Sequence, residues 1–287
     1  MKKYTFLALF FIFISSESKA QMLEIGPQIG GMLYTGDLDP PQFSQQFQNL
    51  NFAYGAHFKY NMNPYFSIRA NFTKGSVRGR DSIGTANWQL NRNLSFESDI
   101  TEFSLLIENN LLGFDMSPGS GKYFSLHAFA GIAVYKFNPR TLYNGQYHDL
   151  QPLGTEGQGM PGFDDKYSLT QLAVPIGGGL KVKLNNRISV AVELTSRFLF
   201  TDYLDDASGT YVSYEELQAG NGQLAANLAN RQGEYTGIDN PYSQQTGDTR
   251  AKAEVNDYYL TGMVTFSYHF NGANIFSDKN KVGCPTF

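Results

Sequence analysis

Cys284 is the residue that most clearly invites a chemical interpretation, because it is the only cysteine among 287 residues. It lies close to the end of the chain, in the stretch KVGCPTF. An unpaired cysteine in an exported protein indicates either pairing with another chain or a reactive thiol. We therefore expect Cys284 to form a disulfide or a close contact with a partner. The alternative is a solvated thiol in a dispensable tail.

Ser125 and His127 are the next candidates, since a serine and a histidine can form a hydrolytic site. Their spacing places both side chains on one face of a strand, but no acidic third member adjoins them in the sequence. The chain has only four histidines. We expect structural histidines, no catalytic residue and no cofactor, with a lipid-modifying enzyme as a minor alternative.

Asp202, Asp205 and Asp206 share the acidic run TDYLDD, and three carboxylates could bind calcium. The run lacks the spacing and the glycine of a calcium-binding loop. We expect instead the base of a loop, where these carboxylates accept hydrogen bonds from backbone amides and from nearby Arg or Lys. The glycine-rich stretch GTEGQGMPG follows no βα unit, so it indicates a flexible loop and not a phosphate site. No metal site is predicted.

The first twenty residues are typical of a secretory signal peptide. Two lysines precede an apolar run, and a small-residue stretch ends at Ala20. The apolar run is about half the length of a membrane-spanning helix, so a retained anchor is the less favoured interpretation. We expect cleavage before Gln21.

The composition argues against nucleic-acid binding and against helical membrane spans. The net charge is −4, and removing the lysine-bearing leader makes the chain more acidic. Aromatic residues make up 15% of the chain, with 18 Tyr and 23 Phe. No later segment approaches eighteen consecutive apolar residues.

Apolar or aromatic residues recur at every second position in eight segments, which is the period of a strand with two unlike faces. The facing of the fifth segment is ambiguous because both of its registers are apolar. A short helix is expected within one of the connections, near residues 217–228. The eight predicted strands lie near residues 23–33, 52–62, 66–73, 101–112, 123–137, 171–182, 188–198 and 260–270.

The connections alternate between long and short. Long connections near residues 38–50, 79–98, 138–166 and 202–256 follow the odd-numbered strands. This alternation, with an even strand number, is typical of an outer-membrane barrel with short periplasmic turns and long extracellular loops. We predict an all-β, eight-stranded antiparallel barrel in outer-membrane lipid, with both termini of the mature chain in the periplasm.

Charged residues alternate with the apolar ones and would face the barrel interior, because charges facing lipid are costly. An eight-stranded barrel is only wide enough for side chains to fill it. We expect these charges to pair with one another as a plug, with a small channel as the alternative. The predicted network consists of Glu24, Arg69, Glu108, Lys181, Glu193 and Arg197.

Several segments together resemble a known family. They are LEIGPQIGGMLYTGDL, RNLSFESDITE, FNPRTLYNGQYHDLQPLGTEGQG, TDYLDDASGTYV and the terminal CPTF. In these segments the chain is similar to the PorG-type outer-membrane barrel of the type IX secretion system of Bacteroidetes. The resemblance covers nearly the whole mature chain.

The resemblance implies a non-enzymatic component of a protein-export and gliding-motility machine. Its implied partners are the PorK-type periplasmic lipoprotein and the PorN-type ring protein, and the PorK-type lipoprotein is the expected partner of Cys284. The alternative function is an autonomous barrel whose outer loops bind an external ligand or surface. The expected organisation is a signal peptide (1–20), a barrel (21–270) and a periplasmic tail (271–287).

Overall fold

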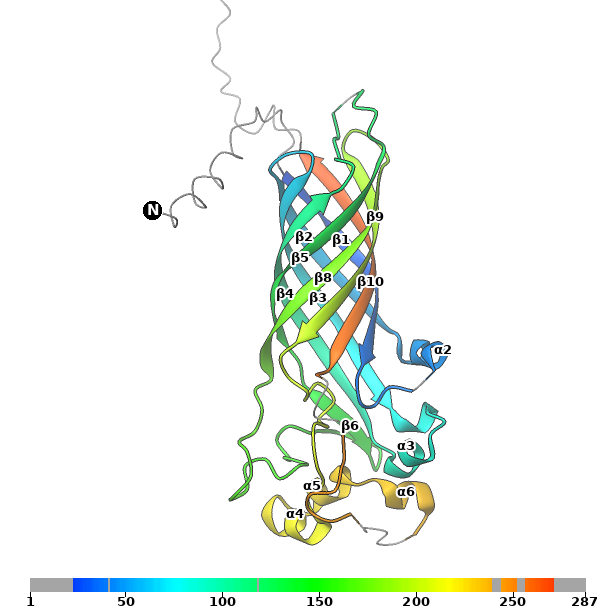
Figure 1. Cartoon of the computed structure of the whole chain (residues 1–287), viewed down its shortest axis with the longest axis vertical. Helices are drawn as coiled ribbons and strands as arrows, with labels where there is room; N and C mark the ends of the chain where they lie inside the picture. Colours follow the sequence, from blue (N-terminus) through cyan, green and yellow to red (C-terminus); the bar gives the residue numbers. More distant parts are fainter. Residues whose placement is uncertain (1–22, 41, 118, 239–243, 252–255, 271–287) are drawn as a thin grey trace, which may run out of the picture.

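The computed structural model describes residues 23–40, 42–117, 119–238, 244–251 and 256–270, which form a barrel with a cap of loops and short helices at one end (Figure 1). The expected signal peptide and tail, including Cys284, lie outside the described residues. Strands β3 and β4 pair with each other and close the sheet, so the prediction of an eight-stranded antiparallel barrel is confirmed. The wall strands are β1 (Leu23–Thr35), β2 (Asn51–Asn61), β3 (Phe66–Arg80), β4 (Ser95–Asn110), β5 (Phe124–Lys136), β8 (Thr170–Lys183), β9 (Ile188–Leu199) and β10 (Tyr258–Phe270).

Side chains alternate between the lumen and the outer surface along every wall strand. On β9, Glu193 is buried while its neighbours Val192 and Leu194 are 57% and 70% exposed. On β5, whose facing was ambiguous, Phe129 and Tyr135 point inward. The inward row of β5 is partly apolar because these two residues contribute aromatic side chains to the packing of the lumen.

The outer surface carries an apolar belt whose edge towards the cap is polar. Lys74, Thr101 and Lys136 are exposed neighbours across β3, β4 and β5, and they form this edge. An exposed apolar surface around a closed barrel with a polar interior is the arrangement that faces lipid. The chain is therefore a barrel of the outer-membrane type.

Short turns join the strands at the end opposite the cap. The side chain of Asn63 accepts hydrogen bonds from two backbone amides in the β2–β3 turn, and Asn185 does the same in the β8–β9 turn. The β4–β5 connection is longer than expected, and its Phe114 and Met116 are buried. Phe114 packs against the lumen residue His269, so this connection helps to close the barrel mouth.

The wall is extended on the cap side, where β3 and β4 run further than the sequence pattern predicted. Their added residues bury Val77 and Phe96 but expose polar side chains such as Arg80 on the other face. Beyond the lipid the outer face no longer needs apolar residues, so the signal used to find the strands disappears there. The third long connection also contains a hairpin, β6 (Pro139–Tyr143) and β7 (Gln146–Asp149), that pairs with β4.

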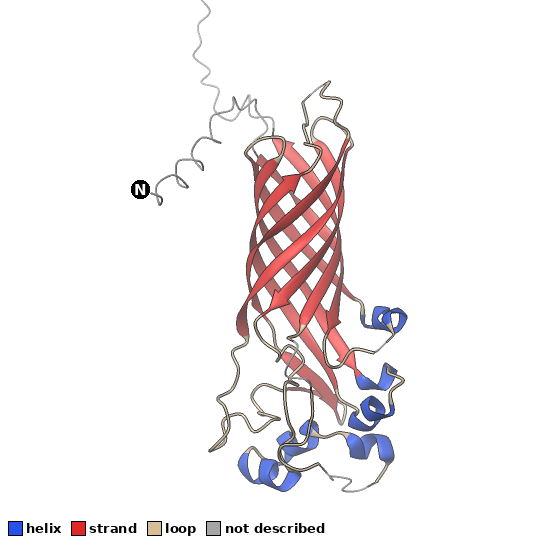
Figure 2. Ribbon diagram, viewed as in Figure 1, coloured by secondary structure: helices blue, strands red, loops and turns tan. Residues whose placement is uncertain are grey.

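The cap contains the helices (Figure 2). Two of them, α4 (Tyr214–Gly220) and α5 (Gln223–Ala229), occupy the segment where one helix was expected. They are separated at Gly222, whose φ of +93° lies in a region that side-chain-bearing residues rarely adopt. The others are α2 (Phe43–Gln46), α3 (Asn87–Arg92) and α6 (Gln232–Thr236).

No helix in the described part of the chain is both long enough and apolar enough to cross a bilayer.

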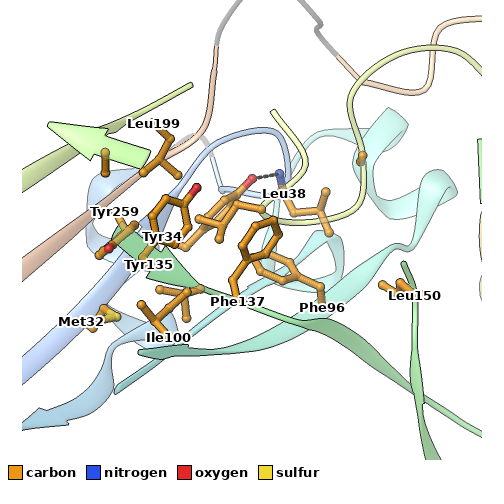
Figure 3. Packing of buried hydrophobic residues seen from close by; sticks show 14 of the residues in the cluster. Met32, Tyr34, Leu38, Phe96, Ile100, Tyr135, Phe137, Leu150, Leu199 and Tyr259 are labelled. Atoms are coloured by element: carbon orange, nitrogen blue, oxygen red, sulfur yellow. Dashed lines mark hydrogen bonds between the residues drawn. The ribbon is translucent and has the colours of Figure 1, made fainter. Parts of the chain in front are cut away.

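An apolar core fills the barrel end beneath the cap (Figure 3). Tyr34, Tyr135 and Tyr259 from three wall strands meet Phe137 and Leu38 from the connections. All five side chains are almost completely buried. This core holds the loops against the barrel mouth and closes the lumen from the cap side.

Candidate functional site

Arg69 and Glu193 form the centre of a buried charge network inside the barrel. The two Nη atoms of the Arg69 guanidinium lie 2.8 and 2.7 Å from the two carboxylate oxygens of Glu193. His127 places Nε2 3.1 Å from the same carboxylate. These residues come from β3, β9 and β5, so the network connects strands far apart around the wall. Such a bidentate contact is among the strongest side-chain interactions.

Glu108 is surrounded by cations. Lys181 Nζ lies 2.6 Å from one of its oxygens, and Lys59 Nζ lies 2.9 Å from the other. Lys59 also lies 3.2 Å from Glu24, which connects Glu108 to the end of β1. All four side chains are buried, so each charge depends on its partners and not on water.

Arg197 forms a separate ion pair nearer the cap. Its Nε lies 3.0 Å from Glu102, and Tyr259 donates a 2.6 Å hydrogen bond to the same carboxylate. Arg197 also hydrogen-bonds to Thr261. The guanidinium lies over the Tyr259 ring at 5.4 Å, which places this pair directly beneath the apolar core.

The six charges expected to pair inside the barrel are therefore all in the lumen, and the structure adds Lys59 and Glu102. Four glutamates face two lysines and two arginines, which balances the formal charge of the network. Lys59 and Glu102 were overlooked as network members, although the alternation already placed them on the inward face.

The lumen leaves almost no open space around Arg69. A cavity of about 10 Å³ lies between Arg69, Gln28 and Thr261. This is roughly the space that one water molecule needs. Ion pairs and neighbouring side chains thus fill the lumen around Arg69, the arrangement expected of a plug.

Glu108, His127 and Glu193 form the only group among the described residues that brings three potential metal-ligand atoms within 4.8 Å. The carboxylates of Glu108 and Glu193 already form ion pairs with Arg69, Lys59 and Lys181. A metal ion would have to displace these cations or lie beside them. The geometry is therefore that of a salt-bridge network.

Ser125 and His127 both point into the lumen, but they do not bond to each other. The Ser125 hydroxyl donates to the backbone oxygen of Leu126, whereas His127 meets Glu193 from β9, an acidic partner that the sequence pattern did not reveal.

A serine–histidine–glutamate arrangement missed at the sequence level is Ser189, His269 and Glu24, with distances of 2.8 and 3.7 Å. All three side chains are buried, which denies a substrate access to them.

The acidic run at the base of the fourth long loop is buried beneath the cap. Asp206 accepts hydrogen bonds from Thr155 at 2.6 Å and from Tyr167 at 2.5 Å, and its backbone oxygen accepts one from Arg250. Asp205 accepts one from the backbone amide of Ala207. The Ala207 amide and Arg250 are of the kinds that were expected, whereas the Thr155 and Tyr167 hydroxyl groups were not.

Burial changes the ionisation of these groups. It raises the pKa of Asp202 to about 7 and that of Asp206 to about 6, and nearby Arg250 opposes the rise at Asp206. Burial also raises the pKa of Asp205 well above its usual value. Asp202 and Asp206 therefore titrate near neutral pH.

Tyr34 Oη lies between two carboxyl groups of the cap, 2.6 Å from Asp205 and 2.9 Å from Asp257. It also accepts a hydrogen bond from the amide of Leu38 (Figure 3). A phenol has one hydrogen, so it can donate to only one of the two carboxyl groups. The second contact is a hydrogen bond only when that other carboxyl is protonated.

Two buried arginines connect the four long loops. Arg92 in the second loop pairs with Asp81 at 2.7 Å and donates to the backbone oxygens of Asp37 in the first and Arg250 in the fourth. Arg250 pairs with Glu156 of the third loop at 2.8 Å. We call Arg92 and Arg250 the loop clamp.

The chain is similar to several solved outer-membrane barrels, at low identity and with TM-scores below 0.5. The N-terminal β-barrel domain of Pseudomonas aeruginosa OprF has a TM-score of 0.36 and 10% identity, over 88% of this chain and 99% of that chain. Ail, the attachment invasion locus protein of Yersinia pestis, has 0.37 and 10%, over 88% and 100%. Neisserial surface protein A has 0.38 and 7%, over 88% and 100%.

No curated protein matches the chain. A family model matches residues 3–228, which include most of the barrel and the first part of the fourth loop. The chain thus belongs to the family described as Domain of unknown function (DUF6089).

Proposed function

We propose that this barrel is a non-enzymatic outer-membrane subunit of the type IX protein secretion and gliding machinery, and that it docks the periplasmic ring to the outer membrane. Its partners in this proposal are the PorK-type lipoprotein and the PorN-type ring protein. The observation that carries the proposal is the filled lumen. A barrel plugged by Arg69, Glu193, Glu108 and Lys181 offers its surfaces, and not a pore, for function.

The loop segments that resemble the PorG-type barrels support the same choice. RNLSFESDITE contributes Arg92 of the loop clamp and the first part of β4, and TDYLDDASGTYV contributes the buried Asp205 and Asp206. These segments form the structural base of the cap. Their resemblance is therefore a resemblance in how the cap is built.

The topology favours contact with a partner on the short-turn side. Strand β10 ends at Phe270 at that end of the barrel, while the long loops lie at the other end (Figure 1). Short turns face the periplasm in outer-membrane barrels. The expected tail 271–287, with Cys284, would then begin in the periplasm, an oxidising compartment where disulfides persist.

Electrophoresis of whole membranes under non-reducing conditions tests the proposed contact, after free thiols have been blocked during lysis. A higher-mass band that contains the PorK-type lipoprotein, collapses on reduction and disappears in Cys284→Ser is the expected result. If the unmodified protein shows no higher-mass band and Cys284→Ser still secretes fully, Cys284 does not form the proposed disulfide.

Removal of residues 271–287 tests docking independently of the disulfide. We expect that the ring proteins no longer co-purify with the barrel and that secretion is lost, while the barrel itself still folds. A shortened fourth outer loop serves as the matched control. Loss of secretion only in the loop variant would contradict the docking role. A separate variant, His127→Ala, tests the enzyme alternative: loss of secretion in this variant, with the barrel still folded, would favour an enzyme.

A further inference from the structure

A cavity of about 440 Å³ lies in the cap beside the loop clamp. It is lined by α3, α6 and part of the segment 244–251, and α3 and α6 lie in contact with each other (Figure 1). Its volume falls within the range of about 300 to 1,000 Å³ that is usual for small-molecule sites. The lining residues that matter here are Trp88, Asn91, Tyr211, Gln232, Gln244 and Thr249.

Trp88 is the only tryptophan of the chain, and it is 55% exposed at this cavity. The guanidinium of Arg92 lies over its ring at 5.1 Å, a cation–π contact that holds the indole in place. Arg92 is itself fixed by Asp81. An ordered aromatic ring that remains open to solvent provides a flat apolar surface for a ligand.

Amide side chains line the same cavity, and hydrogen bonds orient two of them, Gln232 and Gln244. Asn230 donates to Gln244 at 2.6 Å, and Gln244 donates to Gln232 at 3.0 Å. The exposed amide of Asn91 lies on α3 together with Trp88. The cavity thus combines an aromatic surface with groups that both donate and accept hydrogen bonds.

The positive charges of the cavity are already matched by carboxylates. Arg92 forms two hydrogen bonds with Asp81, at 2.8 and 2.7 Å, and Arg250 pairs with Glu156 at 2.8 Å. An anionic ligand would have to compete with these buried carboxylates. The two arginines thus offer no unmatched positive charge to an anion, and the neutral amides that share the cavity wall, alongside Asp37, favour an uncharged polar ligand.

We propose that this cavity binds a neutral oligosaccharide. A sugar ring has an apolar C–H face that can pack on Trp88, and its rim carries hydroxyl groups that match the amides of Asn91 and Gln232. The position at the long-loop end would present the site to glycans outside the cell. This inference does not depend on the proposed secretion role.

Tryptophan fluorescence tests the proposal directly, because all tryptophan emission comes from Trp88. The full-length protein, folded in a detergent without a sugar headgroup, is titrated separately with maltotetraose, cellotetraose, mannotetraose and chitotetraose. We expect a saturable change in emission with at least one of them below about 10 mM, because even a Kd of about 1 mM gives near-saturation there. A sulfated disaccharide is titrated in parallel.

Variants then locate the binding, measured by calorimetry so that the signal does not depend on Trp88. Asn91→Ala and Gln232→Ala should each weaken binding by about 2- to 10-fold, the usual effect of losing one hydrogen bond. Gln146→Ala, at an exposed amide on β7 that is not among the lining residues of the cavity, is the matched control and should bind normally. Three results would overturn the proposal: no saturable response to any of the four sugars, binding of the sulfated sugar alone, or unchanged affinity in both cavity variants.

Discussion

Individual residues show how this barrel keeps charge in its interior. Arg69 and Glu193 are almost fully buried, and they meet through two short hydrogen bonds. Removing one partner of such a pair leaves an uncompensated charge, whereas removing both leaves none. The pair therefore makes a sharper test than either residue alone.

We expect Arg69→Met to lower the free energy of unfolding by about 3 to 5 kcal/mol, because Glu193 would remain buried without its main partner. The double variant Arg69→Met/Glu193→Met should cost clearly less than this single variant. Urea unfolding of the refolded protein in lipid vesicles measures both, and Arg187→Met in the exposed β8–β9 turn is the control. A double variant less stable than the single one would contradict the pairing.

The buried carboxyl groups of the cap predict a dependence on pH. Burial raises the pKa of Asp202 to about 7 and that of Asp206 to about 6, so the folded cap keeps protons that the unfolded loop releases near pH 4. Their contribution to stability is complete below that pH and is lost as pH rises through 6 to 7. The cap should therefore open more readily at pH 8 than at pH 5.

Limited proteolysis of the fourth loop measures this opening, with the protease rate calibrated at each pH on a peptide substrate. Cleavage should be faster at pH 8, and Asp202→Asn should reduce the difference because its amide stays neutral. Asp165→Asn, at an exposed position, should leave the difference unchanged. Cleavage that is equally fast at both pH values would show that these groups do not control the cap.

At the scale of the strand, the two faces are fitted to different surroundings. Outward residues of β9 such as Val192 and Leu194 are exposed apolar groups, whereas the inward Glu193 and Arg197 are paired. The apolar belt ends where Lys74, Thr101 and Lys136 lie side by side. Val192 pairs with Val264 and has apolar outward neighbours on both sides along β9, so it lies well inside the belt.

Val192→Arg should therefore destabilise the protein in lipid vesicles by about 2 to 4 kcal/mol, as expected for a cation near the bilayer midplane. Thr101→Arg, at the polar edge of the belt, should cost about 1 kcal/mol or less. Reversible unfolding in vesicles measures both variants. If both variants lose the same free energy of unfolding, the position assigned to the apolar belt is wrong.

The whole molecule is a plugged barrel whose four long loops are joined into one cap. The loop clamp connects all four loops through Arg92 and Arg250, and the apolar core beneath it fills the barrel mouth. The cap and the wall are thus separate layers of stabilisation. Disrupting the clamp should loosen the loops without opening the sheet.

Arg92→Met tests this separation, because it leaves Asp81 buried without its cation and breaks the contacts with Asp37 and Arg250. We expect faster proteolysis of the fourth loop, by about 10-fold or more if the cap loses about 1.4 kcal/mol or more. We expect a barrel that stays folded in detergent to migrate differently in electrophoresis before and after heating, and Arg92→Met should retain this shift. Arg80→Met, an exposed arginine nearby, is the control. Loss of the shift would mean that cap and barrel fold as one unit.

The sequence alone determined the wall of this protein. A two-residue period reports which face a side chain occupies, so it located eight strands, placed Glu24, Arg69 and Glu193 inside, and ordered the long and short connections. The pattern weakened beyond the lipid, where β3 and β4 continue with a polar outer face. The ends of these strands were missed for that reason.

Only the tertiary structure decided which partners meet. Arg69 and Glu193 are 124 positions apart, and Tyr34 and Asp205 are 171 apart, so no local pattern connects them. Their encounter depends on strand register, on closure of the sheet and on how the loops fold back over its mouth. The cavity beside Trp88 was likewise invisible in the sequence, because its walls come from separate loops that the buried contacts of Arg92 and Arg250 bring together.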